Sequence, residues 1–246
     1  MAALAGKNVL LTALEEFVGR PVAAALAAEG ARVLASDESF DDVAARDAFE
    51  AENENFLAAE SLDPDDLADE ALELLDGRVD ILVSNDGFPA IRAPVDQADP
   101  QDMRDGLEAL VVRPFALAGA LVPAMREAGG GRLLFVTSAA PLIGLANYSM
   151  YATARGAQNA MVKSLARELA RDQILVNAIA PNFVESPTYF PEDLLADAAS
   201  RDKILKNIPL GRLGKPEEVA QLVAFLASER CGFMTGCVLP IAGGWA

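Results

Sequence analysis

Short apolar runs alternate with longer amphipathic stretches along most of the chain. The short runs are bounded by Gly, Asp or Ser, which is typical of strands buried on both faces of a parallel sheet. The predicted strands are 7–12, 32–36, 80–84, 132–138, 175–180 and 237–241. The predicted helices are 18–29, 64–76, 100–128, 149–171 and 216–228. This alternation predicts an α/β fold, a Rossmann-like doubly wound parallel sheet with helices on both faces, whose ligands bind at the carboxyl ends of the strands.

The pattern is that of a single domain spanning residues 1–246. The 246 residues contain no Pro/Gly/Ser-rich linker, low-complexity segment or internal repeat that would divide them. A net charge of −17 speaks against nucleic acid and anionic membrane surfaces as partners, because both are bound through basic patches. No signal peptide is visible at the start, and the uncharged helical stretch 114–125 is too short to span a bilayer. We therefore expect a cytoplasmic protein.

The composition also limits the chemistry that the chain performs. It contains no histidine, which excludes Ser–His–Asp hydrolases and most zinc sites. The two cysteines, Cys231 and Cys237, have no second ligand pair nearby, so we expect inert core or interface residues and no metal site. Any general base must therefore be Asp, Glu, Tyr, Lys or a perturbed cysteine.

The turn after the first predicted strand argues against a dinucleotide cofactor. In doubly wound folds this turn is rich in glycine, so that a pyrophosphate approaches the backbone and the start of the next helix. Residues 12–19 contain one glycine, and Phe17 adds a ring where bare backbone is required. Glu15 and Glu16 would face the pyrophosphate, at a cost of roughly 3 kcal/mol for each pair of like charges about 5 Å apart at an effective dielectric of about 20. Asp37 follows the second strand at the usual place of a ribose-binding acid, which alone is a weak signal.

A second feature is a tyrosine and an arginine one helical turn apart. Tyr151 and Arg155 are at positions i and i+4, so they share a helix face with about 5–6 Å between their Cβ atoms. A fixed cation favours the phenolate form of a nearby tyrosine, and arginine keeps its charge at working pH. Ser138 ends the preceding central strand, which a right-handed connection brings beside the start of the helix. Tyrosine and arginine at this spacing alone are typical of a solvated helix face; together with Ser138 they predict a catalytic site.

Over nearly its whole length the chain resembles the short-chain dehydrogenase/reductase superfamily. The motifs that carry the resemblance are 137–139 at the end of the fifth strand of that superfamily, Tyr151 at the start of its active-site helix, 181–182 in place of Pro-Gly, and the closing segments 232–236 and 242–244. Three positions depart from the pattern: Arg155 replaces the active-site lysine, Phe17 replaces the middle glycine of the turn, and Ser-Asn-Asp-Gly at 84–87 replaces Asn-Asn-Ala-Gly.

At these positions the chain resembles the halohydrin dehalogenases. The motif of that family is a Thr, then any four residues, an aromatic residue, any one residue and a Gly, and it is matched by Thr12, Phe17 and Gly19. The family also has a Ser–Tyr–Arg triad. Other runs similar to the family are 36–40, 83–86, 113–117 and 181–183. The resemblance implies a carbon–halide lyase without a cofactor, which closes vicinal haloalcohols to epoxides, releases halide and a proton, and opens epoxides with azide, cyanide, nitrite or halide. Some members extend beyond the final Gly-Gly with a tail that reaches a neighbouring subunit's active site, whereas only Trp245 and Ala246 follow it here.

The resemblance also assigns roles to individual residues. Tyr151 takes the proton from the substrate hydroxyl, Arg155 stabilises the phenolate and relays the proton to solvent, and Ser138 hydrogen-bonds the substrate oxygen. The halide site is placed at the loop after the sixth strand, where backbone N–H groups of Phe183 and Val184 would face the leaving ion. The predicted halide-binding residues are Phe17, Pro181, Asn182, Phe183 and Val184. The predicted substrate-pocket residues are Thr12, Asp86, Phe88, Tyr189 and Phe190.

Two other functions fit the same sequence. One is an NAD(P)-dependent oxidoreductase with a divergent cofactor turn, and the other is a catalytically silent scaffold that binds a small ligand or a partner. The superfamily usually assembles as tetramers through the helices near 100–128 and 149–171, so we expect a homotetramer by analogy. Small side chains that favour close helix packing there are Ala116, Ala118, Ala120, Ala157 and Ala160.

Overall fold

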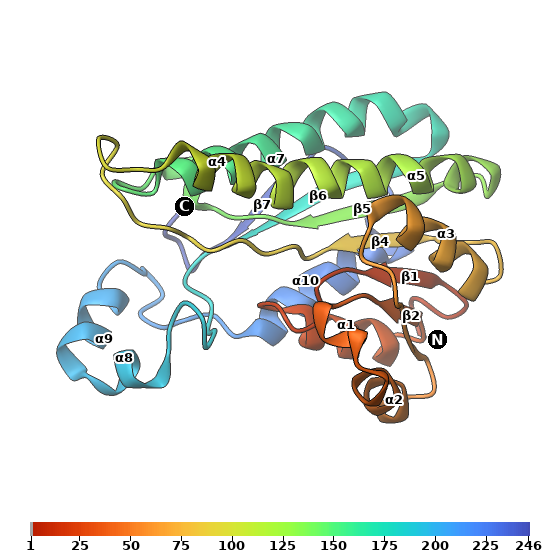
Figure 1. The fold of residues 1–246 in the computed structure, drawn as a ribbon, viewed down its shortest axis with the longest axis horizontal. Helices are drawn as coiled ribbons and strands as arrows, with labels where there is room; N and C mark the ends of the chain where they lie inside the picture. The colour runs from red at the N-terminus through yellow and green to blue at the C-terminus, as the bar shows by residue number, and fades with distance from the viewer. Residues whose placement is uncertain (1) are drawn as a thin grey trace.

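The computed structural model describes residues 2–246 and places one parallel sheet between two layers of helices (Figure 1). The seven strands follow the order β3-β2-β1-β4-β5-β6-β7, and neighbouring strands pair in parallel. Their bounds are β1 Asn8–Leu11, β2 Arg32–Ala35, β3 Phe56–Ala58, β4 Ile81–Ser84, β5 Gly131–Val136, β6 Ile174–Pro181 and β7 Val238–Ile241. The strand order reverses between β1 and β4, which is the point where doubly wound folds bind ligands.

The helices form two layers, each over its own apolar core (Figure 1). One layer consists of α1 (Gly19–Ala28), α2 (Val43–Glu52) and α10 (Pro216–Ala227). The other consists of α3 (Pro64–Leu74), α4 (Pro100–Leu107), α5 (Arg113–Glu127) and α7 (Ser149–Leu169). Shorter helices are α6 (Ala140–Ile143), α8 (Glu192–Ala196) and α9 (Ala198–Leu205). The last two form a segment that projects beside the carboxyl ends of the strands (Figure 1).

The alternation of apolar runs predicted this architecture correctly, and the six predicted strands are present. The pattern missed β3 and α2, because β3 has only three residues and α2 is rich in alanine, with a single buried residue, Phe49. It also missed the short helices α6, α8 and α9. The predicted helix over 100–128 is interrupted by a π-helical turn, Glu108–Val112, directly before Pro114, which has no N–H to continue the α-helical ladder.

The long helix formed by α4, the π-helical turn and α5 corrects two details of the sequence analysis. Pro100–Glu127 is continuous over 28 residues, so by length and composition it is long and apolar enough to cross a membrane, unlike the stretch 114–125 taken alone. Its Leu117 and Leu121 are buried in the core between the helix and the sheet. A core helix of a globular domain is packed in the same way. Ala118 is 2 % exposed and packs inside the same core, so it is not available for packing between subunits.

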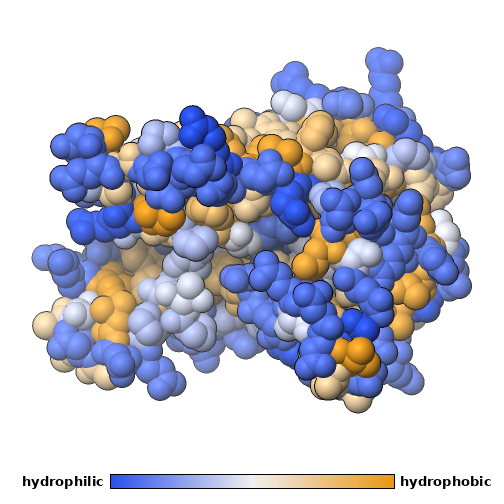
Figure 2. Space-filling view, viewed as in Figure 1, coloured by the Kyte–Doolittle hydropathy of each residue, from blue (hydrophilic) through white to orange (hydrophobic). Residues whose placement is uncertain are grey.

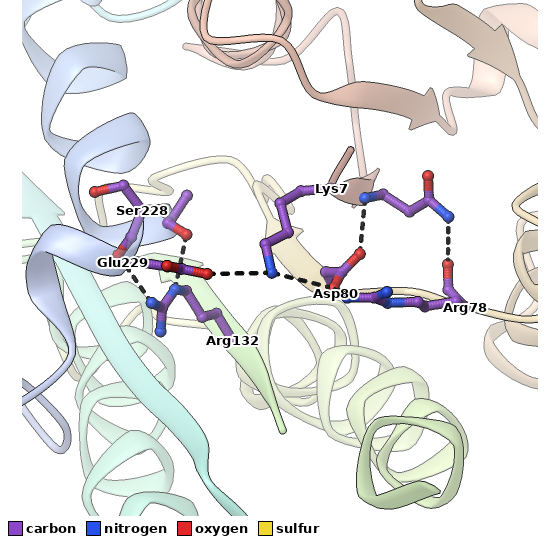
Figure 3. Close-up of polar contacts among 8 residues, drawn as sticks. Lys7, Arg78, Asp80, Arg132, Ser228 and Glu229 are labelled. Atoms are coloured by element: carbon purple, nitrogen blue, oxygen red, sulfur yellow. Dashed lines mark hydrogen bonds and ion pairs between the residues drawn. The ribbon is translucent and has the colours of Figure 1, made fainter. Parts of the chain in front are cut away.

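A polar network closes the opposite end of the sheet, where the strands begin (Figure 3). Lys7 Nζ lies 3.7 Å from Asp80 and 3.6 Å from Glu229. Arg132 on β5 donates to the carbonyl oxygen of Ser228 at 2.8 Å, and burial lowers the pKa of this guanidinium. These contacts tie the end of α10 to the central strands, so this end of the sheet is occupied by structural ion pairs.

Candidate active site

Ser138, Tyr151 and Arg155 line one cavity of about 280 Å³ at the carboxyl ends of the central strands. Ser138 follows β5, is 5 % exposed, and its Oγ accepts the N–H of Ala140 at 3.1 Å, which fixes the start of α6. Tyr151 lies in the first turn of α7, with Arg155 one turn further along. Strand β5 and helix α7 therefore bring the three predicted catalytic side chains into the same space.

Arg155 is held from several sides beneath the ring of Tyr151. Its guanidinium carbon lies 5.6 Å from the centroid of that ring. Its Nη1 donates to the carbonyl oxygen of Val136 at 3.1 Å and to Gln158 Oε1 at 3.0 Å, and its Nη2 donates to the carbonyl oxygen of Asp86 at 3.2 Å. The cation is 5 % exposed, so its field acts on the tyrosine with little screening by water.

The loop that follows β6 is fixed in an unusual backbone conformation. Phe183 has a φ of 55°, and its N–H donates to Asn182 Oδ1 at 2.8 Å. The carbonyl oxygen of Phe183 accepts the N–H of Gly214 at 2.9 Å, so the loop is clamped to the segment before α10. Among residues 2–246, no acceptor is within hydrogen-bond distance of the Val184 N–H. Of the two predicted halide donors, Val184 is thus free and Phe183 is engaged by its neighbour's side chain.

Aromatic rings form much of the remaining cavity wall. Phe17 meets Tyr189 edge-on, with ring centroids 6.0 Å apart, and Phe183 lies 6.1 Å from Phe190. Trp245 packs edge-on against Phe183 at 5.6 Å. The chain's own carboxyl-terminal tryptophan therefore supports the predicted halide loop, a contact that the sequence analysis did not foresee. Figure 2 shows apolar side chains bordering a hollow on the side of the molecule where α8 and α9 lie.

All five predicted halide-site residues, with Tyr189 and Phe190, line this cavity, but three predicted pocket residues do not. Thr12 and Asp86 line a larger neighbouring cavity of about 600 Å³. Asn85 faces the catalytic cavity and Asp86 the neighbouring one, because successive residues of an extended chain point to opposite sides. Phe88 lies behind Tyr151, over the space left by Gly106 on α4.

Sequence reasoning missed several polar residues of the cavity wall, among them Asn85 and Tyr148. The Asn85 amide donates to the carbonyl oxygens of Ala13 at 2.9 Å and Glu16 at 2.8 Å, so it holds the turn after β1 in place. Tyr148 precedes Tyr151 by three residues, and this spacing was the available signal that both rings share one side of the helix start.

The residues around the larger cavity do not fit a nicotinamide dinucleotide. The cavity lies over the ends of β1, β2 and β4, where such a cofactor would bind, and its lining includes Glu16 and Glu38. Glu15 also lines it, but its carboxylate is paired with Arg20 at 2.6 Å. The carboxylate of Asp37 already accepts the N–H of Glu15 at 2.8 Å and the N–H of Ser39 at 2.9 Å. The turn therefore presents negative charge to a pyrophosphate, and the ribose position is occupied by contacts within the chain.

The remaining glycine of this turn serves packing. A Cβ at Gly19 would lie 2.2 Å from the carbonyl oxygen of Leu14 and 2.8 Å from that of Ala13. Both are backbone atoms, so the start of α1 packs against the turn only because residue 19 has no side chain. Retention of this glycine is explained without a bound phosphate.

The scaffold is that of a short-chain dehydrogenase/reductase. Its defining features are this strand order, a serine after β5, and a tyrosine and a basic residue one turn apart on α7. A family model described as enoyl-(acyl carrier protein) reductase matches residues 13–246. The 3-oxoacyl-(acyl-carrier-protein) reductase of Escherichia coli (strain K12) is 33 % identical over 97 % of both chains.

Solved structures place the chain more narrowly. A structure titled as a dehalogenation enzyme is 45 % identical, with a TM-score of 0.95 over 99 % of this chain and 100 % of the other. A halohydrin dehalogenase bound to ethyl (2S)-oxiran-2-ylacetate is 36 % identical, with a TM-score of 0.91 over 97 % of this chain and 96 % of the other. The chain belongs to the halohydrin dehalogenases, within the short-chain dehydrogenase/reductase superfamily.

Proposed function

We propose that the protein closes vicinal haloalcohols to epoxides, with release of halide and a proton, and opens epoxides with small anions in the reverse direction. One observation carries this proposal: the Ser–Tyr–Arg side chains and the loop 181–184 line the same cavity. A base and a site for an anion are therefore close enough to act on the two ends of one small molecule. The related structure with a bound epoxide supports the same substrate class.

In the forward reaction Tyr151 removes the proton from the substrate hydroxyl. Ser138 donates a hydrogen bond to the substrate oxygen and orients it, and the charge of Arg155 favours the phenolate that acts as base. The substrate oxygen then forms a bond to the neighbouring carbon while the carbon–halide bond breaks, and the halide leaves with the electron pair. No electrons are gained or lost overall, so the reaction requires no nicotinamide.

The leaving halide is received by the loop 181–184 and the rings beside it. The free N–H of Val184 supplies one hydrogen bond, and rotation of the Asn182 side chain would release the N–H of Phe183 as a second. Aromatic edges carry partial positive charge, so the rings of Phe17 and Phe190 suit a large, weakly hydrated anion. Backbone donors aimed at developing charge are worth about 10²- to 10³-fold in rate in other enzymes.

Azide-dependent loss of a small terminal epoxide tests the proposed function. Wild-type protein is expected to consume the epoxide in the presence of azide, and Tyr151→Phe, which keeps the ring and removes only the acid–base hydroxyl, is expected to lose at least about 100-fold in rate. Circular dichroism of both proteins provides the folding control. Equal rates for the two proteins would contradict the proposal.

The assembly is proposed to be a homotetramer located in the cytoplasm. The π-helical turn and α5 leave Val112 and Phe115 half exposed, and Leu142 and Ile143 on α6 are exposed as well. Apolar side chains of this kind are typical of surfaces that subunits cover. Light scattering coupled to size exclusion checks the state: four times the 25.9 kDa chain is expected, and a monomer would contradict it.

A further inference from the structure

Glu16 lies where the two cavities at the carboxyl ends of the strands adjoin. It lines the larger cavity and also the one that holds the predicted halide loop, and Gly87 is the other residue that lines both. A Cβ added at Gly87 would lie 3.0 Å from Glu16 Oε2 and 3.2 Å from its Cδ, so the carboxylate rests against the bare backbone of residue 87. The proposed reaction gives this carboxylate no role.

The backbone of Glu16 is fixed from two sides. The Asn85 amide donates to its carbonyl oxygen at 2.8 Å, and its own N–H donates to the carbonyl oxygen of Ala13 at 3.1 Å. The next residue, Phe17, lines the catalytic cavity and meets Tyr189 edge-on. The carboxylate of Glu16 therefore starts from a defined position, directly beside a predicted halide-binding residue.

The charge of Glu16 is not neutralised by a neighbouring cation. Among residues 2–246, no ion pair or hydrogen bond engages its carboxylate, whereas that of Glu15 pairs with Arg20 Nη2 at 2.6 Å. The field of Glu16 also reaches the aromatic wall of the cavity. Burial is the main cause that raises the pKa of Tyr189, and the charge of Glu16 acts in the same direction.

An unpaired negative charge beside an anion site weakens the binding of any anion there. The repulsion is strongest where protein and not water separates the two charges, and salt screens it in part at an exposed side chain. A halide that has left its substrate must depart before the next haloalcohol reacts, and product release limits the rate of many enzymes. Weak retention of the ion therefore favours turnover.

We propose that Glu16 sets the anion affinity of the halide site: its unpaired carboxylate repels the bound ion, which eases halide release after ring closure and raises the azide concentration required for ring opening. Uncharged haloalcohols and epoxides do not experience this repulsion, so the effect is confined to the anionic partner. The inference rests on the proposed function for its meaning in catalysis, but the anion affinity itself is measurable without any substrate.

Bromide binding, followed by the fluorescence of Trp245, tests this role. Trp245 is the one tryptophan of the chain and packs against Phe183 of the halide loop, so a saturable change reports occupancy of that loop. Glu16→Gln is expected to lower the dissociation constant for bromide by roughly three- to tenfold, and Glu16→Lys to lower it further. Glu16→Asp keeps the charge and is expected to stay within about twofold of the wild type.

Glu15→Gln is the matched control. It changes the net charge of −17 by the same one unit, one position away along the chain. Glu15 lines only the larger of the two cavities, and its partner Arg20 stays paired with Glu52 at 2.7 Å. The dissociation constant for bromide is therefore expected to change by less than about twofold. Equal tightening in Glu15→Gln, no tightening in Glu16→Gln and Glu16→Lys, or no saturable bromide binding in any of these proteins would overturn the inference.

Kinetics provide the second readout. In epoxide opening by Glu16→Gln, the KM for azide is expected to fall by the same factor as the dissociation constant for bromide, while the KM for the epoxide stays in place. In ring closure, bromide is expected to inhibit the variant at a correspondingly lower concentration. An equal fall of both KM values would contradict an effect of charge on the anion alone. Absence of halide release from the wild type would instead reject the proposed function, while the bromide titration still decides the role of Glu16.

Discussion

The positive charge at the site belongs to Arg155, which lies against the ring of Tyr151 and makes no hydrogen bond to its hydroxyl among the described residues. Arg155 is fixed by carbonyl oxygens beneath the ring of Tyr151, and Asn182 covers the N–H of Phe183. Ser138 is buried at the end of β5 with its Oγ directed at the start of α6. Each group is held by the surrounding backbone, which keeps the cavity in one geometry before substrate enters.

Asp86 is a carboxylic acid beyond the end of β4 whose surroundings disfavour its charged form. Burial raises the pKa of its carboxyl above the value of 3.8 expected for the unfolded chain, although a hydrogen bond from Ser84 opposes this effect. A raised folded-state pKa means that stability is full at low pH and is lost as the pH rises through that pKa.

Asp86→Asn is therefore expected to raise the melting temperature at neutral pH. The gain is expected because asparagine carries no charge for burial to penalise, and thermal unfolding of both proteins at several pH values measures it. The difference should shrink as the pH falls, because a carboxyl whose pKa is raised in the folded protein loses its charge first on acidification. Asp197 is exposed and its hydrogen bonds to Ser200 lower its pKa, so Asp197→Asn, the control, should give no gain. A lower melting temperature for Asp86→Asn at neutral pH would contradict this reading.

At the scale of elements, the contact between the turn after β1 and helix α1 fixes the shape of the molecule at the usual cofactor position. Asn85 holds the turn from β4, and Gly19 allows α1 to pack directly on the carbonyl oxygen of Leu14. The same turn carries Phe17 into the catalytic cavity. One short segment thus lines the cavity at the usual cofactor position and forms a wall of the halide site.

Substitution of Gly19 by alanine tests that packing. Gly19→Ala is expected to lower the free energy of unfolding by about 1–3 kcal/mol, because the new Cβ meets backbone atoms that cannot move aside freely. Gly232→Ala is the matched control: its φ is −69°, and a Cβ there has only an ordinary contact, so a gain of about 0.4–1 kcal/mol is expected. Denaturant unfolding of both variants checks the pair, and equal stabilities would contradict the account of α1.

The period of apolar residues was sufficient to predict six of the seven strands and the main helices, but not the short elements or the contacts among loops. Buried parallel strands and amphipathic helices have strong local patterns, so the sheet and its main helices followed from the sequence. The pairings of Tyr189 with Phe17 and of Trp245 with Phe183 join distant segments, and no local pattern encodes them. Asp86 and Thr12 line the neighbouring cavity and not the one with the catalytic side chains, and the side of the chain to which each points could not be predicted from the sequence.

For the whole molecule, the chain has the architecture of a dinucleotide-binding enzyme, while the cavity at the usual cofactor position carries acidic side chains. The E. coli reductase, which is 33 % identical to this chain, represents the alternative function, that of an oxidoreductase. The two functions differ in one global property, the affinity for nicotinamide nucleotides.

NADH and NADPH are expected to leave the melting temperature unchanged. A ligand present at one hundred times its dissociation constant would add about 2.7 kcal/mol of stability, which is readily visible as a thermal shift. The expected absence of a shift follows from the charges of Glu16 and Glu38 at the cavity and the ring of Phe17 in the turn. A clear shift with micromolar nucleotide would favour the oxidoreductase.

Chloride release from 1,3-dichloro-2-propanol in buffer free of nicotinamide tests the central claim most directly. The account predicts that the wild type releases one chloride and one proton for each epoxide formed, and that Ser138→Ala and Tyr151→Phe slow the release by at least about 100-fold. Failure of the folded wild type to release chloride, or release that depends on added NADH or NADPH, would contradict it.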